Sequence, residues 1–146
     1  MKAYWAAFCS SRPDVLPDEP ADVFAFGNTP EMADELGALV VRGVKTATTS
    51  ALEAYGPDEP LPQAGELSVV LDGSGKPLCV VETTEVRVRL FTEVDAAFAF
   101  GEGEGDRSLA YWRAAHERFF GETLPGPFDR AMRVVCERFR LVWPAP

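Results

Sequence analysis

The sequence predicts an α+β fold, a mostly antiparallel sheet or small β-barrel with flanking helices. Three elements support this prediction: a helix near residue 30 with clear start and stop residues, a central hairpin of two apolar strands, and a stretch near the C-terminus in which apolar and polar residues alternate. Helices and strands do not alternate as in βαβ units, so a parallel sheet is not expected. The 146 residues suit a single domain, 1–146, that is long enough to bury a substantial core.

The first helix is expected over residues 29–42. Thr29 is a suitable N-cap, and Pro30 suits the first helical position. Gly43 is a natural C-terminal stop, so the chain turns immediately before Lys45. The apolar residues that recur at helical spacing and define its buried stripe are Met32, Leu36, Leu39 and Val40.

The middle of the chain favours strands. Thr46–Ser50 is rich in hydroxyls and β-branched residues, which suits a short strand or an extended loop. The stretch Tyr55–Gly65 contains Pro and Gly and is expected to be a surface loop. Leu67–Leu71 is a predicted strand, Asp72–Gly75 a turn, and Leu78–Val88 the returning strand of a hairpin. Alternation on that returning strand makes the side chains of Arg87 and Arg89 project together.

The C-terminal part predicts one more helix and one more strand. Asp106 is expected to cap a helix that runs to about Phe120. A break at Gly121–Pro127 follows, and Val134–Val142 alternates well enough to be the last strand.

Composition limits the function classes. No apolar run is long enough to span a bilayer, and no signal peptide is recognisable, so no membrane partner is expected. The three cysteines are far apart in sequence, which predicts neither a disulfide framework nor a redox pair and favours the cytoplasm. The net charge of −9 argues against a wide, nonspecific grip on duplex nucleic acid. Either scattered solubilising charge or a local basic cleft is compatible with the basic residues Arg42, Lys45, Arg87, Arg89, Arg107 and Arg113.

Two stretches carry the chemistry. The segment Arg42–Ser50 places a lysine beside several hydroxyls, and the segment Gly101–Ser108 places carboxylates on a glycine-spaced loop. Lys45 is expected either to act as a base on Thr48 or, as a cation, to hold a phosphate or an oxyanion. For Thr48, a ligand contact is favoured over a nucleophile.

The carboxylates of the acidic stretch have three possible roles: they act as a general acid or base, they bind Mg²⁺, or they belong to a solvated loop. Glu102 and Glu104 are its candidates, whereas Asp106 is best explained as a helix cap. Ser108, in the first turn of the second helix, is a plausible contact to an anion, and Arg107 beside it is another. Trp5 is a better candidate than Trp112 to stack on a base, because Trp112 lies on the apolar stripe of its helix. His116 has no second histidine with which to hold zinc, so no metal and no cofactor are expected.

Four stretches of this chain resemble the ASCH domain family, part of the PUA-like superfamily of small β-barrels. They occur in family order and span nearly the whole chain: Phe26-Gly27-Asn28, Gly43-Val44-Lys45-Thr46-Ala47-Thr48, Pro77–Val86 and Glu102–Arg113. The resemblance implies a barrel with a cleft facing the glycine–lysine–threonine signature. It also implies RNA or a modified nucleoside as the partner, since an acylated-cytidine amidohydrolase and a ribonuclease activity have both been attributed to family members.

The resemblance further implies a catalytic set of Lys45, Thr48 and either Glu102 or Glu104. Thr49 and Ser50 stand where a basic residue often closes the signature. The expected ligand contacts are Gly43, Thr46, Arg89, Arg107, Ser108 and Trp5. A hydrolase is expected to lose turnover on Lys45→Ala while its fold survives. The alternatives are a non-catalytic RNA-binding or regulatory module that uses the same cleft, and a small-molecule sensor. The oligomeric state is left open.

Overall fold

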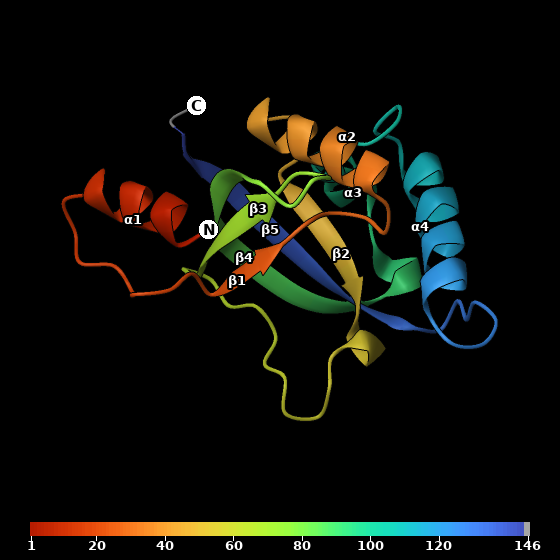
Figure 1. Ribbon diagram of the computed structural model, residues 1–146. Helices are drawn as coiled ribbons and strands as arrows, with labels where there is room; N and C mark the ends of the chain where they lie inside the picture. Colours follow the sequence, from red (N-terminus) through yellow and green to blue (C-terminus); the bar gives the residue numbers. More distant parts are fainter. Residues whose placement is uncertain (145–146) are drawn as a thin grey trace.

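The computed structural model describes residues 1–144 and contains one five-stranded sheet with helices around it (Figure 1). The strands are β1 (Asp22–Phe24), β2 (Ala47–Ala51), β3 (Leu67–Leu71), β4 (Pro77–Leu90) and β5 (Arg133–Trp143). Their order across the sheet is β1-β3-β4-β5-β2, and only the β1–β3 pair is parallel. The long strands β4 and β5 curl, so the sheet forms a half-barrel and confirms the predicted α+β, PUA-like class.

The helices are α1 (Lys2–Ser10), α2 (Pro30–Val41), α3 (Ala96–Glu102) and α4 (Leu109–Thr123), with short 3-10 turns at Leu52–Ala54 and Phe91–Glu93. The segments α2, α3 and α4 gather on one side of the sheet in Figure 1, and α1 lies apart from them. None of the helices in residues 1–144 is both long and apolar enough to cross a bilayer.

The hairpin of β3 and β4 is covered on both faces. Successive strand residues point to opposite faces, so one face carries Val69 and Val80 and the other carries Val70 and Cys79. The first pair packs against Trp5 and Phe8 of α1. The second pair lies in the cluster that α2 covers, whose members include Phe26, Leu36, Val40, Val81 and Phe139. All three cysteines are free.

A third core cluster fixes α3 and α4 against β2 and β5. It joins residues of both helices to the strands, among them Ala47, Phe98, Ala99, Trp112, Phe120, Val134 and Cys136. This cluster is what brings the acidic stretch after α3 next to the start of β2. A backbone hydrogen bond also joins α3 to the start of β2, since the amide of Thr46 donates to the carbonyl of Gly101 at 2.7 Å.

The predicted elements of the first half are confirmed. The hydroxyl of Thr29 accepts a hydrogen bond from the amide of Met32, so Thr29 is the N-cap of α2. Gly43 follows that helix with φ of 76°, the left-handed conformation that favours glycine. Both hairpin strands occur as expected, β4 running slightly further at each end.

The predicted N-cap of the second helix, Asp106, is wrong. Asp106 does not cap it: its carboxylate accepts from the amide of Ser108, in the turn before the helix. Ser108 is the N-cap of α4, accepting from the amide of Tyr111. Three elements were not predicted. The segments α1 and β1 lie in the N-terminal stretch, and α3 lies just before the acidic loop.

Candidate functional site

The lysine cleft, as we call it, lies where α2, β2, α3 and α4 meet. It is about 390 Å³ in volume, and its floor carries Lys45, Thr48, Thr49, Glu102 and Glu104. Residues 26–36 supply one wall and α4 supplies the other. Ligand sites commonly start near 300 Å³, so the cleft suits a ligand of nucleoside size.

Lys45 is the centre of this cleft. Its side chain is 1% exposed, and its ammonium group donates to the carbonyl of Ala47 at 2.9 Å, to Glu102 Oε1 at 3.0 Å and to Glu104 Oε2 at 2.8 Å. These three acceptors use all three N–H bonds of an ammonium. The ring of Phe26 lies 5.2 Å from the same nitrogen. The amine after the first predicted helix therefore meets the acidic stretch, as the site hypothesis required.

Glu102 is the most heavily engaged carboxylate. Its side chain is 2% exposed, and Oε2 accepts from Thr49 Oγ1 and from the indole Nε1 of Trp112, each at 2.6 Å. His116 Nε2 lies 3.3 Å from the same oxygen. Glu102 therefore acts as the fixed anion of the cleft, with no oxygen left free of a partner.

Both ring nitrogens of His116 face acceptors, an arrangement that favours the doubly protonated ring. Nδ1 lies 2.9 Å from the carbonyl oxygen of Trp112, which can only accept, and Nε2 faces a carboxylate, which also accepts. Burial lowers the pKa of His116, but the charge and hydrogen bond of Glu102, the carbonyl of Trp112 and the charge of Glu104 together outweigh burial, and the net shift is upward. The ring stacks on Trp112, with centroids 4.3 Å apart, which fixes its orientation.

The two glutamates are pushed in opposite directions. Burial raises the pKa of Glu102, but Lys45 and His116 outweigh it and hold that pKa well below its usual value. Burial raises the pKa of Glu104 too; Lys45 opposes the rise, repulsion from Glu102 adds to it, and the net shift is upward. Two carboxyls with diverging pKa values are the arrangement in which one stays ionised and the other exchanges a proton.

Lys45 behaves as a cation. Burial lowers its pKa, but the two carboxylates outweigh burial and raise the pKa above its ordinary value. Of the two roles open from the sequence, base or cation, the geometry favours the cation, because an ammonium with a raised pKa does not give up its proton readily.

Of the expected catalytic residues, Glu104 and Thr48 are the two that line the cleft without being fully buried. The Glu104 side chain is 20% exposed, and Lys45 is the one cation that bonds to it among the described residues. Thr48 is half-buried on the floor of the same cleft. On α4, the ring of Tyr111 is 43% exposed and also lines the cleft.

The other expected ligand contacts lie outside the lysine cleft. Trp5 is 4% exposed in the core beneath α1, where its indole donates to the carbonyl of Pro17, so its ring offers no face for stacking. The Thr46 hydroxyl donates to the Gly101 carbonyl. Gly43 lies in the exposed turn after α2. We carry none of these three into the proposed site.

Three further expected contacts are engaged elsewhere. Arg107 donates to the carbonyls of Phe100 and Val44, and its guanidinium lies 3.5 Å from the Phe100 ring centroid. Ser108 caps α4. Arg89 lines a different pocket, together with Arg87. The basic residues of the chain therefore do not form one cleft.

Sequence reasoning missed Thr49, Trp112 and His116, which hold Glu102. A signal was present: Trp112 and His116 are four residues apart and share one helix face, and a buried indole N–H needs an acceptor. No group of three or more His, Cys, Asp or Glu residues that could hold a metal ion occurs within residues 1–144.

The fold and this cleft define the class of protein: a PUA-like α+β half-barrel with a buried lysine–carboxylate centre. A family model described as the ASCH domain matches residues 22–143, and the chain belongs to the ASCH domain family. Membership supports, in general terms, a domain that recognises RNA.

Solved structures agree with the family. The crystal structure of protein EF3133 from Enterococcus faecalis V583 is 37% identical, with a TM-score of 0.86, covering 96% of this chain and 86% of that one. That of an ASCH domain from Lactobacillus crispatus JV V101 is 32% identical, with a TM-score of 0.85, covering 95% and 91%. Hypothetical protein PH0355 is 13% identical, with a TM-score of 0.55, covering 83% and 97%, and shows likeness of fold alone. None of the curated proteins compared with the chain matches it.

Proposed function

We propose that this chain is a hydrolase that acts on a modified nucleoside, an N-acylated cytidine, or on short single-stranded RNA in the lysine cleft. The observation that carries the proposal is the pair of glutamates on one buried lysine, one held ionised and the other with a raised pKa and access to the cleft. The cleft volume of about 390 Å³ favours the nucleoside over a longer strand.

Glu104 is the proton-handling carboxylate in this proposal. As a water oxygen adds to the acyl carbon, Glu104 takes the water proton. The tetrahedral intermediate then breaks its bond from carbon to the exocyclic nitrogen, and Glu104 returns the proton to that nitrogen. The products are a carboxylic acid and cytidine, and no other reactant is needed.

Lys45 and Thr48 stabilise the charge that develops on the acyl oxygen. In the resting cleft all three N–H bonds of Lys45 have acceptors. Once Glu104 takes a proton, it holds the ammonium less strongly, so one N–H becomes available to the oxyanion. Thr48 supplies a hydroxyl donor from the floor of the same cleft. Glu102, ionised throughout, keeps Lys45 charged and in place.

The test is turnover of a panel of N4-acylated cytidines and short single-stranded RNAs by wild type and Glu104→Gln. Loss of the proton-transfer group is expected to lower kcat by about 10²–10⁴-fold. The matched control is Glu117→Gln, which removes a carboxylate from an exposed position of α4 outside the cleft and is expected to leave kcat unchanged.

Equal turnover by Glu104→Gln and wild type would sink the proposal. If no substrate in the panel is turned over by wild type, yet the same compounds bind and Tyr111→Ala weakens that binding, the cleft is a binding module. Tyr111 is the exposed aromatic ring on the cleft wall and the side chain best placed to stack on a base.

A further inference from the structure

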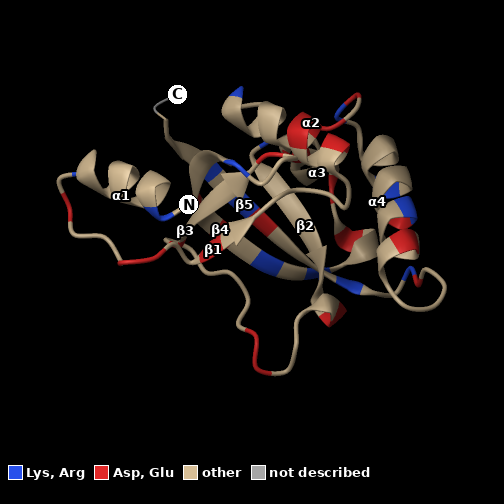
Figure 2. Ribbon diagram, viewed as in Figure 1, with Lys and Arg blue, Asp and Glu red and all other residues tan. Residues whose placement is uncertain are grey.

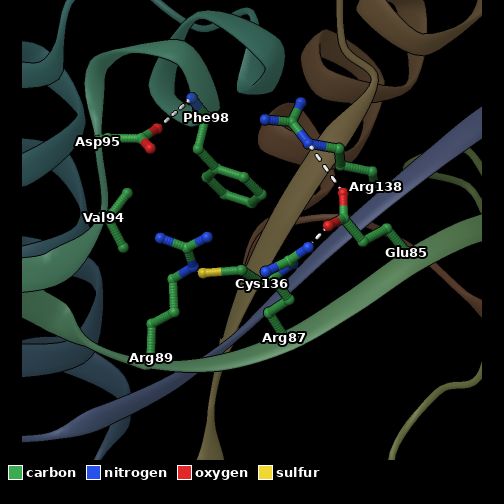
Figure 3. A pocket seen from close by; sticks show the side chains of 8 residues that line it. All are labelled: Glu85, Arg87, Arg89, Val94, Asp95, Phe98, Cys136 and Arg138. Carbon is green, nitrogen blue, oxygen red and sulfur yellow. Dashed lines mark hydrogen bonds and ion pairs between the residues drawn. The ribbon is translucent and has the colours of Figure 1, made fainter.

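A second pocket lies on the face of β4 and β5 that carries α3 (Figure 3). It is about 200 Å³ in volume, and none of the residues that line it also lines the lysine cleft. We call it the arginine pocket, because three guanidinium groups, those of Arg87, Arg89 and Arg138, border it.

The strand register explains why these arginines converge. In the ladder between β4 and β5, Glu85 lies opposite Arg138, Arg87 opposite Cys136, and Arg89 opposite Val134. Positions 85, 87 and 89 alternate onto one face, and their partners on β5 share that face. The backbone positions of the four charged residues are therefore set by two paired strands, not by a flexible loop.

Only part of the positive charge is neutralised within the protein. Glu85 pairs with both Arg87 and Arg138, and no dashed line joins Arg89 to any other residue of the pocket in Figure 3. The nearby carboxylate of Asp95 is used by the backbone, since it accepts from the amide of Phe98 as the N-cap of α3. Arg89 therefore has no ion-pair partner among residues 1–144, and the pocket sets three guanidinium groups against the two carboxylates of Glu85 and Asp95.

The remaining walls of the pocket carry no charge. Val94 and Phe98 are buried, and the Arg138 guanidinium lies 5.2 Å from the Phe98 ring centroid. Burial raises the pKa of the Cys136 thiol to about 11, so this group is neutral near pH 7. No thiolate therefore competes with a bound anion for Arg89.

We infer that the arginine pocket binds a phosphate group of a nucleotide. This site is separate from the proposed hydrolytic centre, and the inference does not depend on turnover. Guanidinium groups pair bidentately with phosphate oxygens, and three of them around about 200 Å³ suit one phosphate, not a nucleoside. The phosphate has two sources, a terminal phosphate of a free nucleotide and a backbone phosphodiester of single-stranded RNA.

Glu85 gives the proposal its sharpest consequence. This carboxylate pairs with two of the three arginines, so an incoming phosphate has to compete with it. Removing its charge should make those arginines more available. Glu85→Gln is therefore expected to tighten phosphate binding, whereas Arg89→Gln is expected to weaken it.

The experiment is titration calorimetry of the full chain with inorganic phosphate, cytidine, cytidine 5′-monophosphate and a short oligocytidylate without a terminal phosphate. Arg89→Gln should weaken binding of phosphate-bearing probes about tenfold or more, the size of a lost charge-assisted hydrogen bond. Cytidine should bind wild type and variant alike. The matched control is Arg130→Gln, an exposed arginine outside both pockets.

The results distinguish the two sources and the two proposals. Weakening with the monophosphate shows that the pocket accepts a terminal phosphate; weakening with the oligonucleotide alone assigns it to the backbone. Glu104→Gln should leave phosphate binding unchanged, so a failed hydrolase assay does not affect this result. The inference is overturned if Arg89→Gln and Glu85→Gln both bind every probe as wild type does. Opposite shifts in these two variants cannot come from a shared loss of folding, which a thermal melt of each variant checks.

Discussion

Lys45 is the single residue on which both the stability and the chemistry of the cleft depend. Its charge is buried and shared between two carboxylates, so removing it leaves Glu102 and Glu104 close together without a counter-ion. Breaking a buried ion pair from one side is strongly destabilising. This placement argues against the expectation that Lys45→Ala would lose turnover while the fold survives, and it makes Glu104 the better position for a test of catalysis.

Lys45→Met is expected to lower the free energy of unfolding by about 3–5 kcal/mol, measured by urea denaturation. The control is Lys76→Met, which removes an exposed lysine in the hairpin turn and should change stability by less than about 0.5 kcal/mol. The double variant Lys45→Met/Glu102→Gln should recover part of the loss, because it removes one of the stranded charges. A Lys45→Met protein as stable as wild type would contradict the ion-pair geometry described here.

His116 predicts a pH dependence of stability. Its pKa is raised in the folded protein, so the stabilisation is fully present below the ordinary value of 6.5 and is lost as pH rises from there through the folded pKa. In His116→Gln this alkaline decline should be smaller than in wild type. Urea denaturation of both proteins between pH 6 and pH 9 measures the difference, and parallel curves would show that His116 is not charged in the fold.

The sequence predicted that Lys45 meets the acidic stretch, but it did not predict which glutamate is held ionised and which has a raised pKa. Glu102 and Glu104 are two residues apart and chemically identical, so only their surroundings distinguish them. Those surroundings come from Thr49 and from α4, whose contacts with Glu102 depend on tertiary packing.

The element that sets this geometry is α3. It begins at the N-cap Asp95 and ends at Gly103, whose φ of 74° places it in the left-handed region. A Cβ at Gly103 would lie 2.6 Å from the carbonyl oxygen of Val44, closer than real contacts allow. This glycine therefore lets the end of α3 approach the backbone beside Lys45, with Glu102 before it and Glu104 after it.

Gly103→Ala is expected to destabilise the protein by more than about 1 kcal/mol and to weaken any activity of the cleft, because the helix end must move away from Val44. Gly121→Ala is the matched control. Gly121 lies within α4 with open space around its Cβ position, so alanine there should stabilise by about 0.5–1 kcal/mol. Thermal or urea unfolding of both variants measures these changes in stability. Equal changes in the two variants would contradict the close approach of Gly103 to Val44.

The elements were predictable to very different degrees. The helix α2 is predictable from its N-cap, its first-turn proline and its helical periodicity, and the β3–β4 hairpin from its turn and its apolar strands. The sequence AAFAFGE of α3 is only seven residues long, too short for a helical period to stand out. The strand β1 is three residues long, and its pairing with β3 is a tertiary contact that no local pattern encodes.

Across the whole molecule, charge is distributed unevenly. The chain carries a net charge of −9, yet Figure 2 shows blue bands on β4 and β5, where the arginine pocket lies. The lysine cleft is lined by as many basic residues as carboxylates: Lys45, His116 and Arg118 against Glu102, Glu104 and Glu122. The helix α3 lies between the two sites, its N-terminal end at the arginine pocket and its C-terminal end at the cleft. Taken together, the two proposals predict that one nucleic-acid strand engages both.

This arrangement predicts how ligand length and salt should act together. A nucleoside in the charge-balanced cleft should bind with little dependence on salt, whereas a short single-stranded RNA that also places a phosphate in the arginine pocket should bind more tightly and lose affinity as salt rises. For single strands, the slope of log K against log salt changes by about 0.7 for each phosphate neutralised. Titrating cytidine and oligocytidylates of one to six nucleotides from low to moderate salt measures both effects. Affinity should rise with length and then level off once both sites are filled, and Arg89→Gln should reduce the slope for the longer strands without changing cytidine. A steep slope for cytidine itself, or a slope for RNA that Arg89→Gln leaves intact, would show that the strand follows another path over this acidic surface.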